Sequence, residues 1–276
     1  MREWLATLIR GYLRATRPHP GRGVLAKLAW RLDPVEFVHV VPSGYRFSIC
    51  LADYGDVAIY SGTADLEDAH WVCEYLEPGD VVFDVGAHVG LFSIMCAKHV
   101  APTGIVVAFE PVPRFITKLK RNLVLNEVTN VRVVPCALSD RRGEFEMYLD
   151  HDASSLFIRT GRKELVSVNT LDEFLEEHPE LRAVKLIKLD VEGAELPVLK
   201  GSCETIKKVR PILLIELFPS RQIKAGFSCE EVFDFVTSLG YCGFIRRGHQ
   251  TRKCPTYIPP PRGRIYENWL FIPCGL

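Results

Sequence analysis

Hydrophobic and polar positions follow two different periods along most of this chain. From residue 80 onward, seven short runs are rich in valine, isoleucine, leucine and phenylalanine: residues 81–85, 105–110, 131–137, 185–190, 212–217, 241–245 and 268–272. Between most of them, as in FITKLKRNLVLN and SCEEVFDFVTSLG, apolar residues recur every three or four positions and predict helices. Apolar strands alternating with helices predict a doubly wound α/β fold, with ligands at the carboxyl ends of the strands.

Residues 1–17 have a pattern of their own. They place one helical stripe of apolar side chains opposite several arginines: Trp4, Leu5, Leu8, Ile9, Tyr12 and Leu13. The stripe is too short to span a bilayer. It is compatible with a helix lying on a membrane surface, but we favour a helix docked on the domain. We take residues 1–70 as an N-terminal helical and β extension of a domain that covers residues 71–276.

Composition and charge narrow the choice of partners. The 34 basic and 34 acidic residues cancel, so no overall field attracts nucleic acid or an anionic membrane. The nine cysteines are odd in number and lack a C-x-x-C pair, and no signal-like segment precedes them. These features argue against a disulfide framework and a zinc site, and they predict a cytoplasmic protein.

The loop after the first apolar strand, in VVFDVGAHVGLFS, holds two glycines, Gly86 and Gly90. A dinucleotide fingerprint needs G-x-G-x-x-G, but His88 and Leu91 occupy its second and third glycine positions. The turn therefore permits close approach of an uncharged group rather than a diphosphate. Gly86 is also compatible with a simple strand end.

Two acids accompany this loop. Glu110 ends the next strand, where an acid in such folds accepts hydrogen bonds from a ribose, although it could instead cap the following helix. A ribose site without a diphosphate site indicates an adenosyl ligand, and S-adenosylmethionine fits. Asp84 lies inside an apolar strand, where an unpaired acid is costly, and is expected to hold the loop or the ligand's ammonium.

Several motifs together carry a family resemblance. FDVGAHVGLFS, AFEPVPRFITKLKRNLVLN, ALSDRRGEFEMY, SSL, NTLDEFL, IKLDVEGAELPVLKG and RPILLIEL occur in this order. Across about residues 71–219 the chain resembles the FkbM-type S-adenosylmethionine-dependent methyltransferases. One departure is His88, where the family's loop usually reads GANxG.

The resemblance implies both a fold and an activity. The fold is the Rossmann-like class I methyltransferase fold, with a seven-stranded, mostly parallel sheet whose last strand is antiparallel. The activity is O-methylation of a hydroxyl on a saccharide or secondary metabolite, so the partner is a small-molecule or glycan acceptor. Carry-over of the motifs places Asp84, Gly86, His88, Gly90, Glu110, Ala137 and Leu138 at the cofactor, with Ser139 and Asp140 as alternatives near the adenine.

An alcohol acceptor must lose a proton, which requires a base within hydrogen-bond reach. The segment KLDVEGAE ends the fourth strand, and we expect Asp190 or Glu192 to be the base, with Glu216 as a second candidate. Glu195 fits better as an acid that stabilises the start of a helix. Lys188, an ammonium in an apolar strand, is expected to pair with a nearby acid. Two strand-end carboxylates could hold a divalent ion, but no oxygen-rich loop accompanies them, so no metal is expected.

Two further interpretations stay open. The chain could be a nicotinamide-dependent oxidoreductase, which the missing glycine disfavours, or a non-catalytic adenosyl-binding module. The basic segment 246–266 could be a solvated loop or a lid that recognises an anionic acceptor through Arg246, Arg247 and Tyr257.

Overall fold

The computed structural model describes residues 2–15, 21–62, 66–150, 153–155, 162–248 and 250–275. Its centre is an eight-stranded sheet in the order β13-β12-β14-β11-β10-β3-β4-β5. The strands are β3 (Val81–Val85), β4 (Ile105–Phe109), β5 (Val131–Val134), β10 (Val184–Leu189), β11 (Ile212–Leu217), β12 (Tyr241–Arg247), β13 (Gln250–Cys254) and β14 (Glu267–Pro273). Strands β5, β4, β3, β10 and β11 are parallel, and β14 lies antiparallel between β11 and β12. This is the class I methyltransferase fold.

All seven expected strands are present, and two details differ. The run 131–137 divides into β5 and β6 (Ala137–Leu138), and β6 joins a second sheet of order β6-β9-β7-β8 with β7 (Gly143–Asp150), β8 (Ala153–Ser155) and β9 (Arg162–Asn169). The segment 246–266, expected as a loop, contains an eighth strand of the main sheet. That strand forms because the chain reverses at Gly248, where φ is 60°, and β13 then pairs antiparallel with β12.

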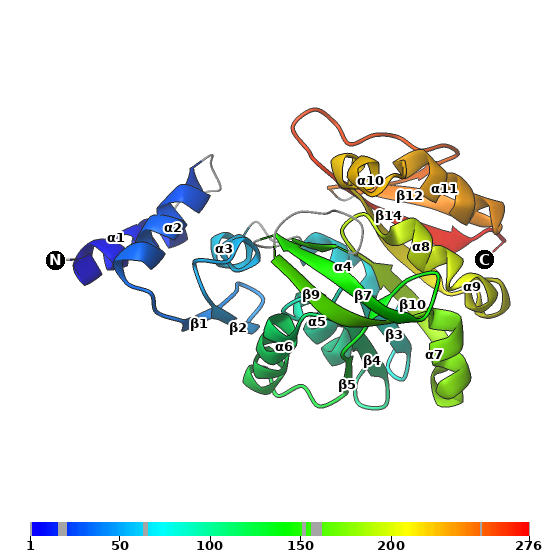
Figure 1. Cartoon of the computed structure of the whole chain (residues 1–276), viewed down its shortest axis with the longest axis horizontal. Helices are drawn as coiled ribbons and strands as arrows, with labels where there is room; N and C mark the ends of the chain where they lie inside the picture. The colour runs from blue at the N-terminus through cyan, green and yellow to red at the C-terminus, as the bar shows by residue number, and fades with distance from the viewer. Residues whose placement is uncertain are drawn as a thin grey trace.

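Helices cover both faces of the main sheet because successive side chains of each buried strand point to opposite faces. Val82 and Leu186 belong to a core shared with α4 (Leu66–Cys73) and α5 (Leu91–Val100). Phe83 and Ile187 belong to a core on the other face, shared with α7 (Leu171–Glu177), α8 (Glu195–Lys200), α9 (Cys203–Val209) and α11 (Cys229–Ser238). Two further short helices are η1 (Pro179–Leu181) and α10 (Pro219–Ala225). Figure 1 shows how the labelled helices surround the sheet.

The N-terminal segment consists of α1 (Arg2–Ala15), α2 (Arg22–Leu32), β1 (Phe37–Val40), β2 (Arg46–Ile49) and α3 (Tyr54–Ser61). In Figure 1, α1 and α2 lie to one side of the main sheet, with α3 between them and the sheet. Two asparagines of α6 (Pro113–Leu125) and its cap attach this segment to the domain. The side-chain oxygen of Asn122 accepts from the Ser48 backbone N–H at 2.9 Å, and that of Asn126 accepts from the Arg46 N–H at 2.8 Å.

A disulfide joins Cys242 of β12 to Cys274, just beyond β14. The cysteine pattern argued against a disulfide framework, and the described residues contain this single bond. The antiparallel register of β12 and β14 places Cys242 opposite Ile272, so the two cysteines approach each other only once the sheet forms, at a Cα–Cα distance of 5.4 Å. The other seven cysteines are free thiols. Across the described ranges, no helix has the length and apolar character needed to cross a membrane.

Candidate active site

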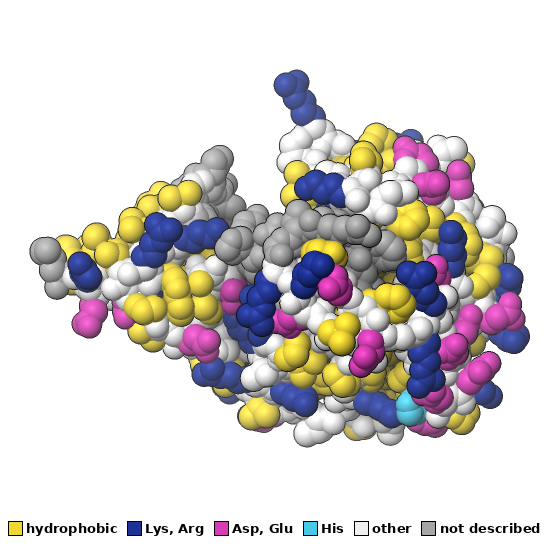
Figure 2. Space-filling view, viewed as in Figure 1, with side chains coloured by type: hydrophobic (Ala, Val, Ile, Leu, Met, Phe, Trp, Pro, Cys, Tyr) yellow, Lys and Arg dark blue, Asp and Glu magenta, His cyan; other side chains and the backbone are white. Residues whose placement is uncertain are grey.

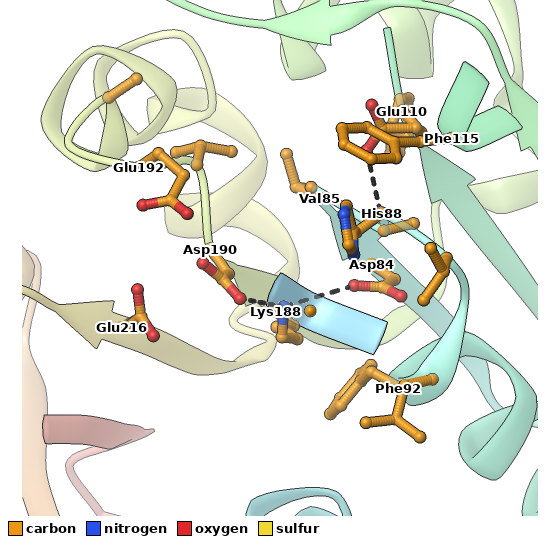
Figure 3. A pocket seen from close by; sticks show the side chains of 18 of the residues that line it. Asp84, Val85, His88, Phe92, Glu110, Phe115, Lys188, Asp190, Glu192 and Glu216 are labelled. Carbon is orange, nitrogen blue, oxygen red and sulfur yellow. Dashed lines mark hydrogen bonds and ion pairs between the residues drawn. The ribbon is translucent and has the colours of Figure 1, made fainter. Parts of the chain in front are cut away.

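A pocket of about 520 Å³ opens at the carboxyl ends of β3, β4, β10 and β11 (Figure 3). It brings together nine of the ten site residues expected from the sequence: Asp84, Gly86, His88, Glu110, Ala137, Leu138, Asp190, Glu192 and Glu216. They converge because parallel strands end at the same edge of the sheet. Gly90 lies outside the wall of this pocket.

The two loop glycines have different reasons to be glycine. Gly86 has φ of 84°, and a Cβ there would lie 1.9 Å from the carbonyl oxygen of Asp190, so any side chain would push β3 and β10 apart. Gly90 precedes α5 with φ of 87°, and a Cβ there would meet Leu119 of α6 at 3.1 Å. Gly86 therefore shapes the pocket floor, whereas Gly90 allows α5 and α6 to pack closely.

The backbone of His88 and the side chain of Glu110 form a hydrogen bond. The backbone N–H of His88, whose φ is 50°, donates to Glu110 Oε2 at 2.8 Å, and the N–H of Val112 donates to Oε1 at 3.0 Å. Glu110 is only 4% exposed, and burial raises its pKa to about 7. The His88 ring lies 4.1 Å from the Phe115 ring, between centroids, and burial lowers its pKa to about 4, so it is neutral.

Lys188 of β10 lies between Asp84 of the neighbouring strand β3 and Asp190, which directly follows β10. Its Nζ is 3.0 Å from Asp190 Oδ2 and 3.7 Å from Asp84 Oδ1. Burial favours a neutral amine, but the carboxylates of Asp190 and Asp84 outweigh it and raise the pKa of Lys188. The fully buried Asp84 also accepts a hydrogen bond from Ser93 Oγ at 2.5 Å. The expectation that Lys188 pairs with an acid is confirmed.

Asp190 and Glu216 differ in protonation. Burial alone would raise the pKa of Asp190, but the ammonium of Lys188 outweighs it and holds that pKa below its usual value. Burial, and then the charge of Asp190, raise the pKa of Glu216 well above its usual value. The two pKa values are therefore shifted in opposite directions, so Asp190 is the more acidic group of the pair and Glu216 keeps its proton to a higher pH than an ordinary glutamate.

The remaining acids of this segment are bound by protein groups. Glu192, with φ of 58°, forms an ion pair with Arg221 of α10. Glu195 is 1% exposed and accepts from the backbone N–H groups of Val191 and Gly193, while the Gln222 side chain donates to its other oxygen. Glu195 therefore orders the turn that begins α8, in agreement with the structural role favoured for it.

Sequence reasoning did not find several pocket residues. Asp68 of α4 accepts a hydrogen bond from the Asn268 side chain of β14, and both line the pocket. They are 200 positions apart, so no local pattern connects them. Gly55, Ala58 and Ile59 of α3 add a wall from the N-terminal segment.

Part of the basic segment 246–266 also reaches the site. Ile265 and Tyr266 line the pocket. Arg246 instead pairs with Glu74 at 2.8 Å, and Arg247 and Arg264 pair with the buried Glu267 at 3.6 and 3.1 Å. Among the residues that the structure describes, no three His, Cys, Asp or Glu side chains are grouped closely enough to hold a metal ion.

Comparison with known proteins agrees with this geometry. The model of the methyltransferase FkbM domain matches residues 84–242, which is more than half of the chain. This chain belongs to the FkbM methyltransferase family. It is thus a methyltransferase, and the resemblance seen in its motifs is confirmed.

The relatives in this family are moderately similar. The chain is 30% identical over 203 residues to Methyltransferase 1 of Beauveria bassiana, a match that covers 65% of this chain and 76% of the relative. It is 33% identical over 160 residues to the 31-O-demethyl-FK506 methyltransferase FkbM of Streptomyces tacrolimicus. That match covers 46% of this chain and 60% of the relative. The FkbM methyltransferase structure from Methylobacillus flagellatus aligns with 98% of this chain and 60% of its own, at 16% identity and a TM-score of 0.47.

Proposed function

We propose that this chain is an S-adenosylmethionine-dependent O-methyltransferase that acts on a hydroxyl of a saccharide or secondary metabolite. Relatives carry names of this kind: besides the FK506 enzyme, they include the 2-O-methyltransferase NoeI of Sinorhizobium fredii, 29% identical over 207 residues, and the hexuronic acid methyltransferase AglP of Haloferax volcanii, 27% identical over 162 residues. The observation that carries the proposal is the ionised Asp190, held by Lys188, in the same pocket as Glu110 and the glycine turn.

The pocket residues fit the proposed cofactor. Glu110 keeps a carboxylate at the end of β4 where two ribose hydroxyls can donate to it. Ala137 and Leu138 provide an apolar wall for an adenine ring. Asp84 Oδ1 lies 3.7 Å from the Lys188 Nζ, accepts no shorter contact from the described residues, and can also interact with a cationic group of the ligand. When bound, S-adenosylmethionine supplies a methyl group on a sulfonium, which is an excellent leaving group.

Among the three acids considered as a base, the structure favours Asp190. It is ionised, it lines the pocket, and it can accept the proton that an acceptor hydroxyl must lose. Burial and the neighbouring charge of Asp190 raise the pKa of Glu216 and so favour its protonated form, and the carboxylate of Glu192 is paired with Arg221. The ammonium of Lys188 keeps Asp190 ionised.

Binding of the cofactor is the first test. Titration calorimetry with S-adenosylmethionine, its demethylated product and NAD should show binding of the two adenosyl compounds only. At 100 times the Kd, the bound ligand should stabilise the fold by about 2.7 kcal/mol, seen as a higher melting temperature. Absence of both signals would refute the assignment of the cofactor.

Measurements of methyl transfer test the assignment of Asp190 as the base. In a screen of glycans and hydroxylated metabolites, Asp190→Asn should lower kcat about 100-fold or more with cofactor affinity preserved, and Glu192→Gln should have a smaller effect. Asp234→Asn, on an exposed residue of α11 away from the pocket, is the control. Cofactor binding without transfer to any acceptor would instead support a non-catalytic adenosyl-binding module.

The division of the chain is also a proposal. We propose that residues 71–276 form the methyltransferase domain and that residues 1–70 are an extension that completes its pocket, supported by the contribution of Gly55, Ala58 and Ile59 to the wall. A cytoplasmic location and the absence of a nucleic-acid partner remain predictions.

A further inference from the structure

Exposed apolar side chains are concentrated at the N-terminal end of the structure. Thirteen large hydrophobic residues are strongly exposed in the described structure, and nine of them lie between residues 4 and 40: Trp4, Leu5, Leu8, Tyr12, Val24, Leu28, Val35, Val38 and Val40. Clustering of this kind marks an interaction surface, whereas single exposed hydrophobic residues do not.

Helix α1 has two apolar sides, and only one is covered. Ala6 and Leu13 are fully buried, and Leu13 joins a core with Ala26 and Ala29 of α2. On that side α1 packs against α2 of the same N-terminal segment, and its docking on residues 71–276 stays a prediction. The apolar stripe is wider than the contact, however, so residues three or four positions apart on the other side remain in solvent, with Trp4 66% exposed and Leu8 49% exposed.

The same segment carries a strong positive charge. Residues 1–40 contain seven arginines and lysines and three acids, Glu3, Asp33 and Glu36, in a chain whose net charge is zero. Arg2, Lys27 and Arg31 are exposed on α1 and α2. Figure 2 shows hydrophobic and basic side chains side by side on the part of the surface formed by these two helices.

We propose that this N-terminal surface, formed by Trp4, Leu5, Leu8, Tyr12, Val24 and Leu28 with Arg2, Lys27 and Arg31, binds the surface of an anionic phospholipid bilayer. A helix of 14 residues cannot span the hydrocarbon core, but it can lie in the interface with its apolar side inserted and its cations beside lipid phosphates. A second copy of the chain fits less well, because it would bring two positively charged segments together.

Binding there would hold the active site near the bilayer. Helices α1 and α2 rest on α3, and the Tyr60 hydroxyl of α3 donates to the Arg10 carbonyl oxygen at 2.8 Å. The same α3 forms a wall of the pocket. The proposal does not depend on the identity of the reaction, because the membrane-binding surface lies on α1 and α2, whose described residues do not line the pocket.

Vesicle flotation of the full chain tests the proposal. Vesicles of phosphatidylcholine alone are compared with vesicles containing about 30% phosphatidylglycerol, at about 0.1 M and about 0.5 M salt. We expect at least about 10-fold stronger binding to the anionic vesicles at low salt, and a marked decrease at high salt. Binding to neither vesicle, or equal binding to both, would overturn the proposal.

Variants separate the apolar and the ionic contributions. Trp4→Ser with Leu8→Ser, and Lys27→Glu with Arg31→Glu, should each reduce vesicle binding roughly 10-fold or more. Val124→Ser with Leu165→Ser removes equally exposed apolar side chains elsewhere and should change nothing. Melting temperature and S-adenosylmethionine affinity confirm that each variant is folded. If the wild-type chain instead dimerises, and the N-terminal variants abolish the dimer while vesicle binding is unaffected, the surface is a contact between two copies and the proposal is wrong.

Discussion

Lys188 lowers the pKa of Asp190. Its register opposite Asp84 on the paired strand β3, and its place two residues before Asp190, put one ammonium within 4 Å of two carboxylates. Without that charge, burial would favour a protonated Asp190. A residue other than the base itself thereby determines whether that base is ionised.

Replacing Lys188 with methionine should therefore change the pH dependence of the reaction. The pKa of Asp190 should rise, so the acid limb of the kcat profile should move to higher pH, with a loss of activity of at least about 10-fold at pH 6 and less at pH 9. Lys188→Arg should retain the wild-type profile, and Lys185→Met alters an exposed lysine of the same strand. An unshifted profile in a folded Lys188→Met variant would exclude this role.

Glu110 makes cofactor binding sensitive to pH near neutrality. Because its pKa in the fold, about 7, lies above its ordinary 4.5, the neutral carboxyl stabilises the fold at low pH, and this contribution is lost as pH rises through about 7. A ribose hydroxyl donates best to the ionised form. The Kd for S-adenosylmethionine should therefore fall as pH rises from 6 to 8, by up to about 10-fold per unit below 7.

Calorimetry of two variants tests whether Glu110 causes this pH dependence of cofactor affinity. Glu110→Gln should flatten the pH dependence, and Glu110→Ala should weaken binding by roughly 1.5 to 3 kcal/mol while the melting transition stays cooperative. Glu177→Ala, on an exposed acid, is a control. Wild-type affinity in Glu110→Ala would show that this carboxylate does not hold the ribose.

At the scale of elements, the connection from β12 to β14 has two distinct parts. In the hairpin of β12 and β13, Arg246 pairs with Glu74 and lies over the Trp71 ring, and Arg247 pairs with Glu267. Of the described residues in this connection, Ile265 and Tyr266 line the pocket. An anionic-acceptor role for Arg246 and Arg247 therefore loses its main support.

The two parts should respond differently to mutation. Ile265→Ser with Tyr266→Ala should raise the KM for the acceptor several-fold and leave cofactor affinity unchanged, because these residues wall the mouth of the pocket. Arg246→Ala should leave both constants unchanged and lower the free energy of unfolding by about 1 kcal/mol. If Arg246→Ala alone raised the KM for the acceptor, the hairpin would take part in acceptor binding and this interpretation would be wrong.

For the whole molecule, the disulfide constrains the C-terminal part of the sheet. Cys242 and Cys274 are separated by 32 positions, and a cross-link closing such a loop stabilises a fold by about 3 kcal/mol. Cys274→Ser should lower the melting temperature by about 5 °C, whereas Cys203→Ser, on a free cysteine, should have little effect. Thiol titration of the unfolded chain should give seven thiols before reduction and nine after it. Nine thiols without reductant would show that the bond does not form.

The sequence by itself determined seven of the eight strands of the main sheet and the edge of the sheet where the site lies. The runs 81–85 and 212–217 agree with β3 and β11 at both ends, because strands buried on both faces are predominantly apolar. Asp84, Glu110, Asp190 and Glu216 lie in or directly after such strands, so parallel pairing alone predicts their convergence.

Tertiary structure alone decided which of these groups are charged and which distant groups join them. Protonation depends on distances between neighbouring strands, such as the 3.0 Å between Lys188 and Asp190, and on burial that no local pattern reports. The Glu192–Arg221 pair, the contact between Asp68 and Asn268, and the Cys242–Cys274 bond join separate elements. Their partners meet only when the sheet order is set, because strand register rather than sequence spacing determines which side chains become neighbours.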